Sequence, residues 1–302
     1  MFDWQRRCTP NIEGKVPPKT RKALFRQVFC DRILNLVPLN MCYLLFWLPT
    51  IVLTCIFVGV LVLSESAEMS NQLRGLYLAL LFPCIAITGP GRAGIVRVVR
   101  EIACDCYLGG GWSILGNAVK ENWKQALTPS AISGTIPLLM FISWDFYFPK
   151  LCSGSFFSAV PLSILCCATL VWLLSQPCLY HMLVTYELPL SAQICNAVLL
   201  TLKKGFHAAG ILLLERLPPV LLIMLLSFMK PTGWPAAMLS SVLLLYYLAA
   251  GLAVNQLLNE SFANWICEME INVKIPGAHV DIGLASEREI PGNGGDHEQI
   301  LF

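Results

Sequence analysis

The chain is poor in charge and carries none of the common catalytic signatures. Charged side chains make up 13% of its 302 residues, whereas hydrophobic side chains make up 56%. This is about half the charged share of an ordinary soluble domain. A soluble protein of this length could not bury that much apolar surface, so the composition excludes the usual soluble classes.

Motifs for metal, nucleotide and covalent chemistry are also missing. The sequence has no Walker A, HExxH or GxSxG pattern. Its four histidines are not spaced as metal ligands with any cysteine pair, and the run from Cys104 to Cys106 lacks the second pair of a structural zinc site. Because paired acid, base or nucleophile residues are absent, we expect no enzymatic activity, no metal, no cofactor and no nucleic-acid partner.

Long apolar stretches are what the sequence has instead. A membrane-spanning helix needs about 20 mostly apolar residues. The expected spans are residues 39–63, 73–89, 131–148, 157–182, 206–229 and 234–258. The sequence therefore predicts an all-α fold, a polytopic membrane helical bundle of about six transmembrane helices.

The positive charges between these stretches predict an orientation. Of the 21 Lys and Arg residues, 17 lie before the first span, after the last one, or between spans two and three and spans four and five. Three lie on the other side: Arg74, Lys150 and Lys230. The positive-inside rule then puts both termini in the cytoplasm, with anionic lipid headgroups of the bilayer as partners at that face.

The first apolar stretch is expected to serve as an uncleaved anchor. About thirty largely polar residues precede it, unlike a cleavable signal sequence. Most of the thirteen cysteines lie inside spans or on the cytoplasmic side, and Cys152 alone falls in an external loop. No disulfide framework is expected.

Residues 22–37 carry an apolar stripe at helical spacing, with cations on the opposite face. The stripe consists of Phe25, Val28, Phe29, Ile33 and Leu36. This pattern predicts an interfacial helix that presses its cations toward headgroups, either as an orientation anchor or as a lipid or partner site. The chain then divides into a cytoplasmic segment (1–21), a membrane domain (22–258) and a partly flexible cytoplasmic tail (259–302).

Two further cytoplasmic segments resemble each other. Residues 116–127 read GNAVKENWKQAL and residues 195–206 read CNAVLLTLKKGF. Each follows a span that runs inward and precedes one that runs outward, so both are expected to be interfacial helices within a repeat of residues 73–148 and 157–229. Parallel repeats occur in transporters with a site between the halves, and also in bundles that duplication simply built.

Three stretches together resemble the YesL-like family of bacterial integral membrane proteins. They are residues 40–50 (NMCYLLFWLPT), 87–94 (ITGPGRAG) and 117–125 (NAVKENWKQ), within a similarity over residues 22–255. The chain departs from the compact family pattern by residues 58–76, which separate the first two stretches. The motif residues, expected to be structural, are Asn40, Pro49, Gly89, Pro90, Gly91, Arg92, Gly94, Asn117, Trp123 and Asn196.

The resemblance implies a location and a broad role. The family has no established activity, but its members are associated with carbohydrate uptake and degradation. It therefore implies a bacterial plasma-membrane protein that is a transporter or an accessory subunit of a transport system, with a permease as partner. The alternative is a structural or regulatory membrane protein that acts through partner contacts and transports nothing.

Residues 89–94 fit the GxGxxG pattern of dinucleotide sites, but an apolar span precedes them where that fingerprint needs a strand. We expect Pro90 to end the span instead, and the small residues to let helices approach closely. Arg92, Arg97 and Arg100 would then face the headgroups. An anion bound at the N-terminus of the following helix is an alternative.

Glu215 and Arg216 are ionisable residues inside the fifth span. Such groups cost about 2.5–3.5 kcal/mol each in the bilayer and usually face the bundle interior. Adjacent helical positions point about 100° apart, so each needs a partner from another helix, and Asp145 is one candidate for Arg216. These three residues form the predicted binding site. Alternatively, Pro218 begins the span and both residues lie at its edge, although residues 218–230 alone are too short to cross.

Overall fold

The computed structural model describes residues 18, 20–63, 67–104, 107, 109–228, 234–275, 278, 280 and 284. The predicted N-terminal segment and the far end of the predicted tail lie largely outside these residues. The described part of the chain contains helices and no strand. The predicted all-α fold is therefore confirmed.

Long helices follow one another along the chain. They are α1 (Arg21–Leu63), α2 (Ala67–Ala103), α3 (Gly111–Cys152), α4 (Ala159–Thr185), α5 (Leu190–Lys203), α6 (Gly205–Phe228), α7 (Trp234–Tyr246) and α8 (Leu252–Glu270). A π-helix, η2 (Tyr247–Gly251), joins α7 to α8. Two short 3₁₀-helices, η1 (Phe156–Ser158) and η3 (Asn272–Lys274), precede α4 and follow α8.

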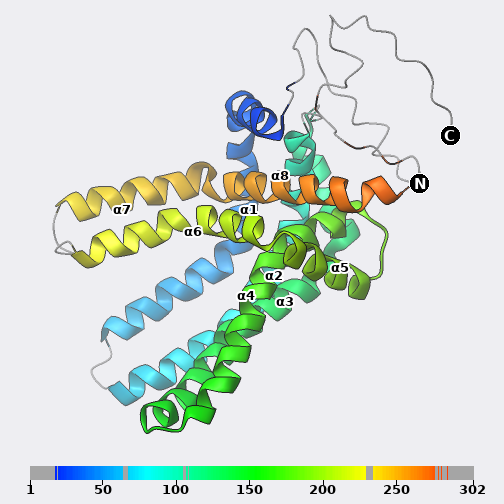
Figure 1. The fold of residues 1–302 in the computed structure, drawn as a ribbon. Coiled ribbons are helices and arrows are strands. Elements are labelled where there is room, and N and C mark those ends of the chain that lie inside the picture. Colours follow the sequence, from blue (N-terminus) through cyan, green and yellow to red (C-terminus); the bar gives the residue numbers. More distant parts are fainter. Residues whose placement is uncertain are drawn as a thin grey trace, which may run out of the picture.

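The helices are long and apolar enough to make this a multi-pass membrane protein. Five helical stretches pass that test among the described residues, and the pair α5 and α6, bent by 95°, makes a sixth if it counts as one broken span. Their outer halves form three antiparallel pairs, α1 with α2, α3 with α4, and α6 with α7 (Figure 1). Large apolar side chains such as Ile56, Ile142 and Leu221 are exposed on these pairs. Such surface is costly in water and suits lipid.

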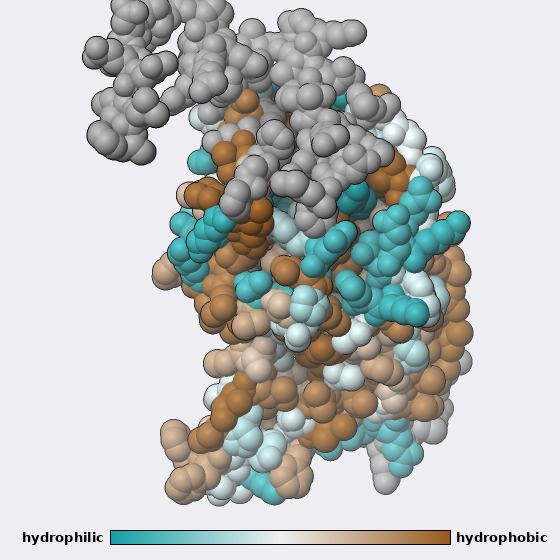
Figure 2. Space-filling view, turned by 90° about the vertical axis from the view of Figure 1, so that its right-hand side faces the viewer, coloured by the Kyte–Doolittle hydropathy of each residue, from teal (hydrophilic) through white to brown (hydrophobic). Residues whose placement is uncertain are grey.

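Polar and apolar side chains are distributed unevenly over the surface. In the face shown in Figure 2, polar residues gather in the upper half and hydrophobic residues dominate the lower half. Ion pairs lie at the end where α8 finishes: Arg21 pairs with Glu268, and Lys203 Nζ donates to Glu270 Oε2 (2.5 Å). The start of α1, the end of α5 and the end of α8 therefore lie close together.

The apolar stripe of residues 22–37 packs partly inside the protein, with Val28 and Leu36 buried and Phe25, Phe29 and Ile33 partly exposed. These residues do not form a separate helix but begin the long helix α1. Val28 and Leu36 are buried against Ile95 and Val99 of α2 and Leu257 of α8. The difference from the prediction has a simple cause, because apolar side chains on α2 and α8 exclude water from the stripe more completely than headgroups would.

Pro90 lies within α2, so the expectation that it ends the helix is wrong. Proline has no N–H, which leaves the carbonyl of Ala86 without its usual helical donor. Ser130 of α3 supplies one, because its Oγ donates to the Ala86 oxygen at 2.7 Å. A neighbouring helix thus satisfies the group that proline frees. α2 runs on to Ala103 and no new helix begins at Pro90, so the alternative of an anion at such a helix N-terminus also falls.

The two repeat-like segments differ in structure. Residues 116–127 lie within the continuous helix α3, whereas α5 ends at Lys203 and α6 leaves it at 95°. Lys204, between them, has φ −118° and ψ 34°, which breaks the helix. The matched Ala118 and Ala197 are both buried.

Asn40 of α1 stabilises the π-helix. Its Nδ2 donates to the carbonyl oxygens of Tyr247 (3.0 Å) and Leu248 (2.7 Å), and the N–H of Ala253 donates to its Oδ1 (3.0 Å). A π-turn disturbs the regular helical pairing, and one buried amide satisfies three of the backbone groups concerned. From η2, α8 crosses the predicted domain boundary at residue 258 and reaches Glu270, with Ile266 fully buried.

Candidate functional site

A cavity of about 360 Å³, lined by both polar and apolar side chains, lies among α1, α2, α3, α4, α6, η2 and α8. This volume is at the lower end of the range typical of small-molecule sites, roughly 300–1,000 Å³. Its charged lining residues are Arg92, Glu215 and Arg216. Two of the three residues predicted as a site, and one motif residue, therefore meet at one cavity.

The glycines of residues 89–94 determine how α2 approaches its neighbours. A Cβ on Gly91 would lie 2.4 Å from Phe46 of α1, and one on Gly94 would lie 2.7 Å from Val119 of α3. A real Cβ atom could not come so close to these side chains. The absence of a side chain at each glycine therefore lets Phe46 and Val119 pack directly against the backbone of α2. The same helix carries Arg92 toward the cavity, where α1 and α3 also contribute to the wall.

Neutral groups hold the Arg92 guanidinium. Its Nη1 donates to Gln176 Oε1 (3.1 Å), and its Cζ lies 4.4 Å from the centre of the Tyr180 ring. A cation over an aromatic face is attracted by the ring quadrupole. Both partners belong to α4, so Arg92 links α2 to α4 across the cavity wall.

The expectation that three arginines of α2 face headgroups is wrong. Arg92 lines the cavity, Arg97 Nη1 donates to the carbonyl oxygen of Val184 (2.8 Å), and Arg100 is only 3% exposed. The cause is the continuity of α2 through Pro90, which carries all three residues along a helix that packs inside the protein.

Glu215 and Arg216 lie in the wall that α6 contributes. Asn259 Nδ2 of α8 donates to Glu215 Oε2 at 3.4 Å. Arg216 lines the cavity at the next position, although its side chain is also exposed. α6 continues through Pro218 without a break, so that proline does not begin a new helix.

Asp145 is not part of the site. It is exposed on α3 and does not line the cavity that contains Arg216. The predicted pairing with Arg216 is therefore wrong. The hydrogen-bond partner of Glu215 comes from α8, whose amide residues Asn255, Gln256 and Asn259 line the cavity.

Several polar atoms of the lining residues have no partner within the described part of the protein. They are Trp47 Nε1, Arg92 Nε, Gln176 Nε2 and Asn259 Oδ1, all shielded from solvent. An unmade hydrogen bond of a buried group costs about 1–3 kcal/mol. The wall thus carries hydrogen-bonding capacity that the fold itself does not use.

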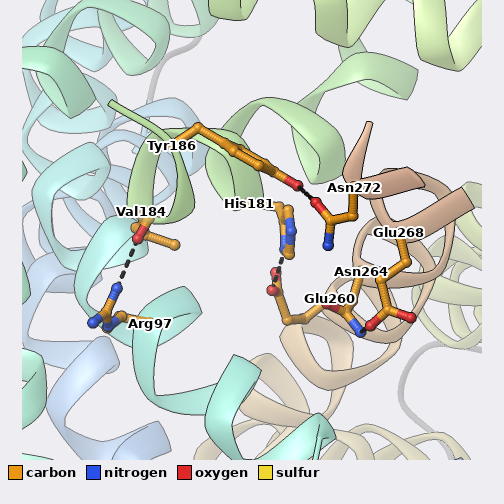
Figure 3. Close-up of polar contacts among 8 residues, drawn as sticks. All are labelled: Arg97, His181, Val184, Tyr186, Glu260, Asn264, Glu268 and Asn272. Carbon is orange, nitrogen blue, oxygen red and sulfur yellow. Dashed lines mark hydrogen bonds and ion pairs between the residues drawn. The ribbon is translucent and has the colours of Figure 1, made fainter. Parts of the chain in front are cut away.

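A second polar cluster lies beside the cavity (Figure 3). His181 Nδ1 lies 2.5 Å from Glu260 Oε1, and both side chains are only 2% exposed. These residues directly follow Tyr180 and Asn259, which line the cavity, so the pair joins α4 to α8 behind its wall.

The same cluster continues toward the end of α8. Tyr186 donates to Asn272 Oδ1 (2.7 Å), and Asn264 Nδ2 donates to Glu268 Oε1 (2.8 Å). Burial, with a smaller contribution from Cys267, raises the pKa of the Tyr186 phenol well above its ordinary value, so this hydroxyl remains a donor. Sequence reasoning missed the cluster, although His181 is an ionisable residue at the end of an uncharged run and could have drawn attention.

The remaining motif residues lie away from the cavity. Asn117 is exposed on α3 and Asn196 is partly exposed on α5. Trp123 is 48% exposed, with Lys124 Nζ 5.6 Å from its ring centre. Pro49 lies within α1. These positions give no indication of a second binding site.

Comparison with known proteins identifies no relative. No family model matches the chain, and no curated protein or solved structure is significantly similar to it. The resemblance to the YesL-like family therefore stays a prediction.

Proposed function

We propose that the protein is a transporter, or an accessory subunit of a transport system, that binds a small polar solute in the cavity between its helices. The observation that carries this proposal is the cavity itself, about 360 Å³ lined by two arginines, a glutamate and several amides. In a bundle with a purely structural role, apolar side chains would fill this space at lower cost, because polar and ionisable groups are expensive at membrane depth.

The proposed location is the bacterial plasma membrane, with both termini in the cytoplasm and anionic headgroups at that face. The excess of Lys and Arg in the intervening segments supports this orientation. Two ion pairs add support, because Arg21 with Glu268 and Lys203 with Glu270 join the ends that the orientation assigns to one side. The cavity would then lie nearer the cytoplasmic ends of the spans, where Arg92 and Asn259 are found.

The proposed solute is hydroxylated. Amide side chains such as Gln176 and Asn255 both donate and accept hydrogen bonds, as hydroxyl groups require of their partners. Aromatic rings, including those of Tyr43 and Tyr180, also line the cavity and suit the apolar CH face of a sugar ring. The resemblance to the YesL-like family points in the same direction, toward carbohydrate uptake.

Reconstitution and co-purification test this function together. The purified protein in liposomes would be assayed for flux of labelled mono- and disaccharides, and the protein from native membranes would be examined for a stoichiometric permease. Flux by the protein alone supports a transporter, and solute binding with a permease but without flux supports an accessory subunit. The absence of both solute binding and a permease would contradict the proposal and favour the structural or regulatory alternative.

A matched pair of variants links the result to the cavity. Arg92→Gln alters the lining, whereas Arg74→Gln changes an exposed arginine on the same helix that is not part of it. Only the first should impair binding or flux. Equal impairment by both would show that the cavity is not the site.

A further inference from the structure

The charges in the cavity wall do not balance. Two guanidinium groups, those of Arg92 and Arg216, face one carboxylate, that of Glu215. Among the described residues, no carboxylate lies within ion-pair distance of Arg92. A cation kept inside a membrane protein normally has a counter-charge, and here the protein supplies only the neutral Gln176 and Tyr180.

The polar groups in the Arg92 part of the wall that lack a hydrogen-bond partner are donors. Trp47 Nε1, Arg92 Nε and Gln176 Nε2 come from three different helices, α1, α2 and α4, and none has an acceptor within the described part of the chain. Each of these groups can only donate. A ligand that suits them must bring acceptor oxygens, and beside a guanidinium an anionic oxygen forms the strongest bond.

α6 and α8 add acceptors to the wall. Glu215 offers carboxylate oxygens, one of them bonded weakly to Asn259 at 3.4 Å, and Asn259 Oδ1 has no donor among the described residues. These acceptors call for hydroxyl groups. The donors without a partner therefore come from α1, α2 and α4, whereas α6 and α8 supply the acceptors Glu215 and Asn259 Oδ1 beside the further donor Arg216.

We propose that the solute is a small organic anion that carries one carboxylate and at least one hydroxyl group. The carboxylate pairs with Arg92, whose planar guanidinium can bond both oxygens, and Gln176 and Trp47 donate to the same group. The hydroxyl donates to Glu215 or Asn259. This inference rests on the proposed function, since it requires the cavity to be a solute site, and it adds the charge of the solute.

Two sources can supply the carboxylate. A dissolved hydroxycarboxylate brings it from the aqueous phase, and the headgroup of phosphatidylserine brings a carboxylate from the bilayer. Measurements in lipid of defined composition separate them. Nanodiscs of phosphatidylcholine contain no competing carboxylate, whereas nanodiscs with phosphatidylserine do.

The experiment is isothermal titration of the full-length protein in phosphatidylcholine nanodiscs with two matched pairs of solutes. Glucuronate and glucose differ by a carboxylate in place of a hydroxymethyl group, and lactate and propane-1,2-diol differ in the same way. At least one anion should bind tenfold or more tightly than its neutral counterpart. Phosphatidylserine should not abolish that binding.

Variants at Arg92 identify the group that senses the charge. Arg92→Gln should reduce the affinity for the anion to that of its neutral counterpart, whereas Arg74→Gln should leave the preference intact. Arg92→Lys keeps the charge but cannot bond both oxygens, so it should retain only part of the preference. Because Lys also preserves the charge of the folded wall, it tests the inference if the Gln variant fails to fold.

The outcomes separate this inference from the proposed function. Equal binding of the anionic and neutral members of both pairs overturns the anion and leaves the solute site standing. Binding of no solute, in either lipid, overturns both. Binding of a neutral solute that phosphatidylserine suppresses, with no binding of any dissolved anion, supports the carboxylate chemistry but assigns it to a headgroup, which contradicts the transport proposal.

Discussion

Replacing Gly89 by alanine should destabilise the protein at the contact between α2 and α3. An added Cβ would lie 2.2 Å from Ser130 Oγ and 2.3 Å from the backbone oxygen of Ala126, whereas real Cβ contacts essentially never fall under 3.0 Å. The serine hydroxyl could rotate away, but the Ala126 carbonyl belongs to the helix backbone. The two helices must therefore move apart.

The expected loss of stability combines three effects. Overpacking of a tight contact costs about 1–3 kcal/mol, and losing the bond from Ser130 to the Ala86 carbonyl costs about 0.5–1.5 kcal/mol. Alanine is the better helix former by about 0.5–1 kcal/mol. The net loss should be about 0.5–4 kcal/mol.

Unfolding in mixed micelles with increasing SDS, followed by far-ultraviolet circular dichroism, measures this loss. Gly116→Ala on α3 is the control, because no atom lies within 4 Å of the place its new methyl group would occupy, and it should be neutral or slightly stabilising. Adding Ser130→Ala to Gly89→Ala removes only one of the three contacts under 3.0 Å and leaves those with the Ala126 oxygen and the Cβ of residue 130, so most of the loss should persist. A Gly89→Ala protein as stable as wild type would refute the close contact of α2 with α3.

Three other predictions concern polar links between helices. Asn40→Leu removes all three hydrogen bonds to η2 and α8 and should lower the free energy of unfolding by about 3 kcal/mol or more. Backbone hydrogen exchange should quicken at η2 but not at the end of α8. Unchanged exchange at η2 would argue against stabilisation of the π-helix by Asn40. His181→Leu should lower the free energy of unfolding by about 3–5 kcal/mol, because it leaves Glu260 unpaired inside the protein. The double variant His181→Leu with Glu260→Met should recover most of that loss. Equal losses in the single and double variants would show that the two residues are not coupled. Hydrogen bonding from Lys203 lowers the pKa of the Glu270 carboxyl, so their link stabilises the protein above the ordinary glutamate range, about pH 4, and is lost as the pH falls through the lowered pKa. The stability difference between wild type and Lys203→Met should therefore vanish in acid, and a difference that grew toward low pH would contradict this assignment.

Apolar length was enough to predict the helices, but not where they end. Pro90 shows why. The local rule that proline breaks a helix assumes that the freed carbonyl has no other donor. Ser130, on a neighbouring helix, supplies that donor in the folded protein. Residues 22–37 show a related limit, because an amphipathic stripe has the same periodicity whether lipid or protein covers it.

The cavity could be predicted only in part. Glu215 and Arg216 stand out because ionisable residues are rare in an apolar run, and both line the cavity. Their partners depend on which helices pack against α6, and a sequence does not contain that information directly. Asn259 falls beyond the predicted last span, where polar residues are common, so its place opposite Glu215 became visible only in the fold.

Protection of the cavity by solute is the most direct test of the central claim. Asn255→Cys introduces a thiol into the lining, and the native Cys152, exposed near the end of α3, serves as an internal control. Labelling by a small maleimide would be followed at each position by peptide mass spectrometry with and without saccharides and hydroxycarboxylates. The account predicts that at least one solute slows labelling at position 255 and leaves Cys152 unaffected. Labelling that no solute changes, or that slows equally at both positions, would contradict a solute site in this cavity.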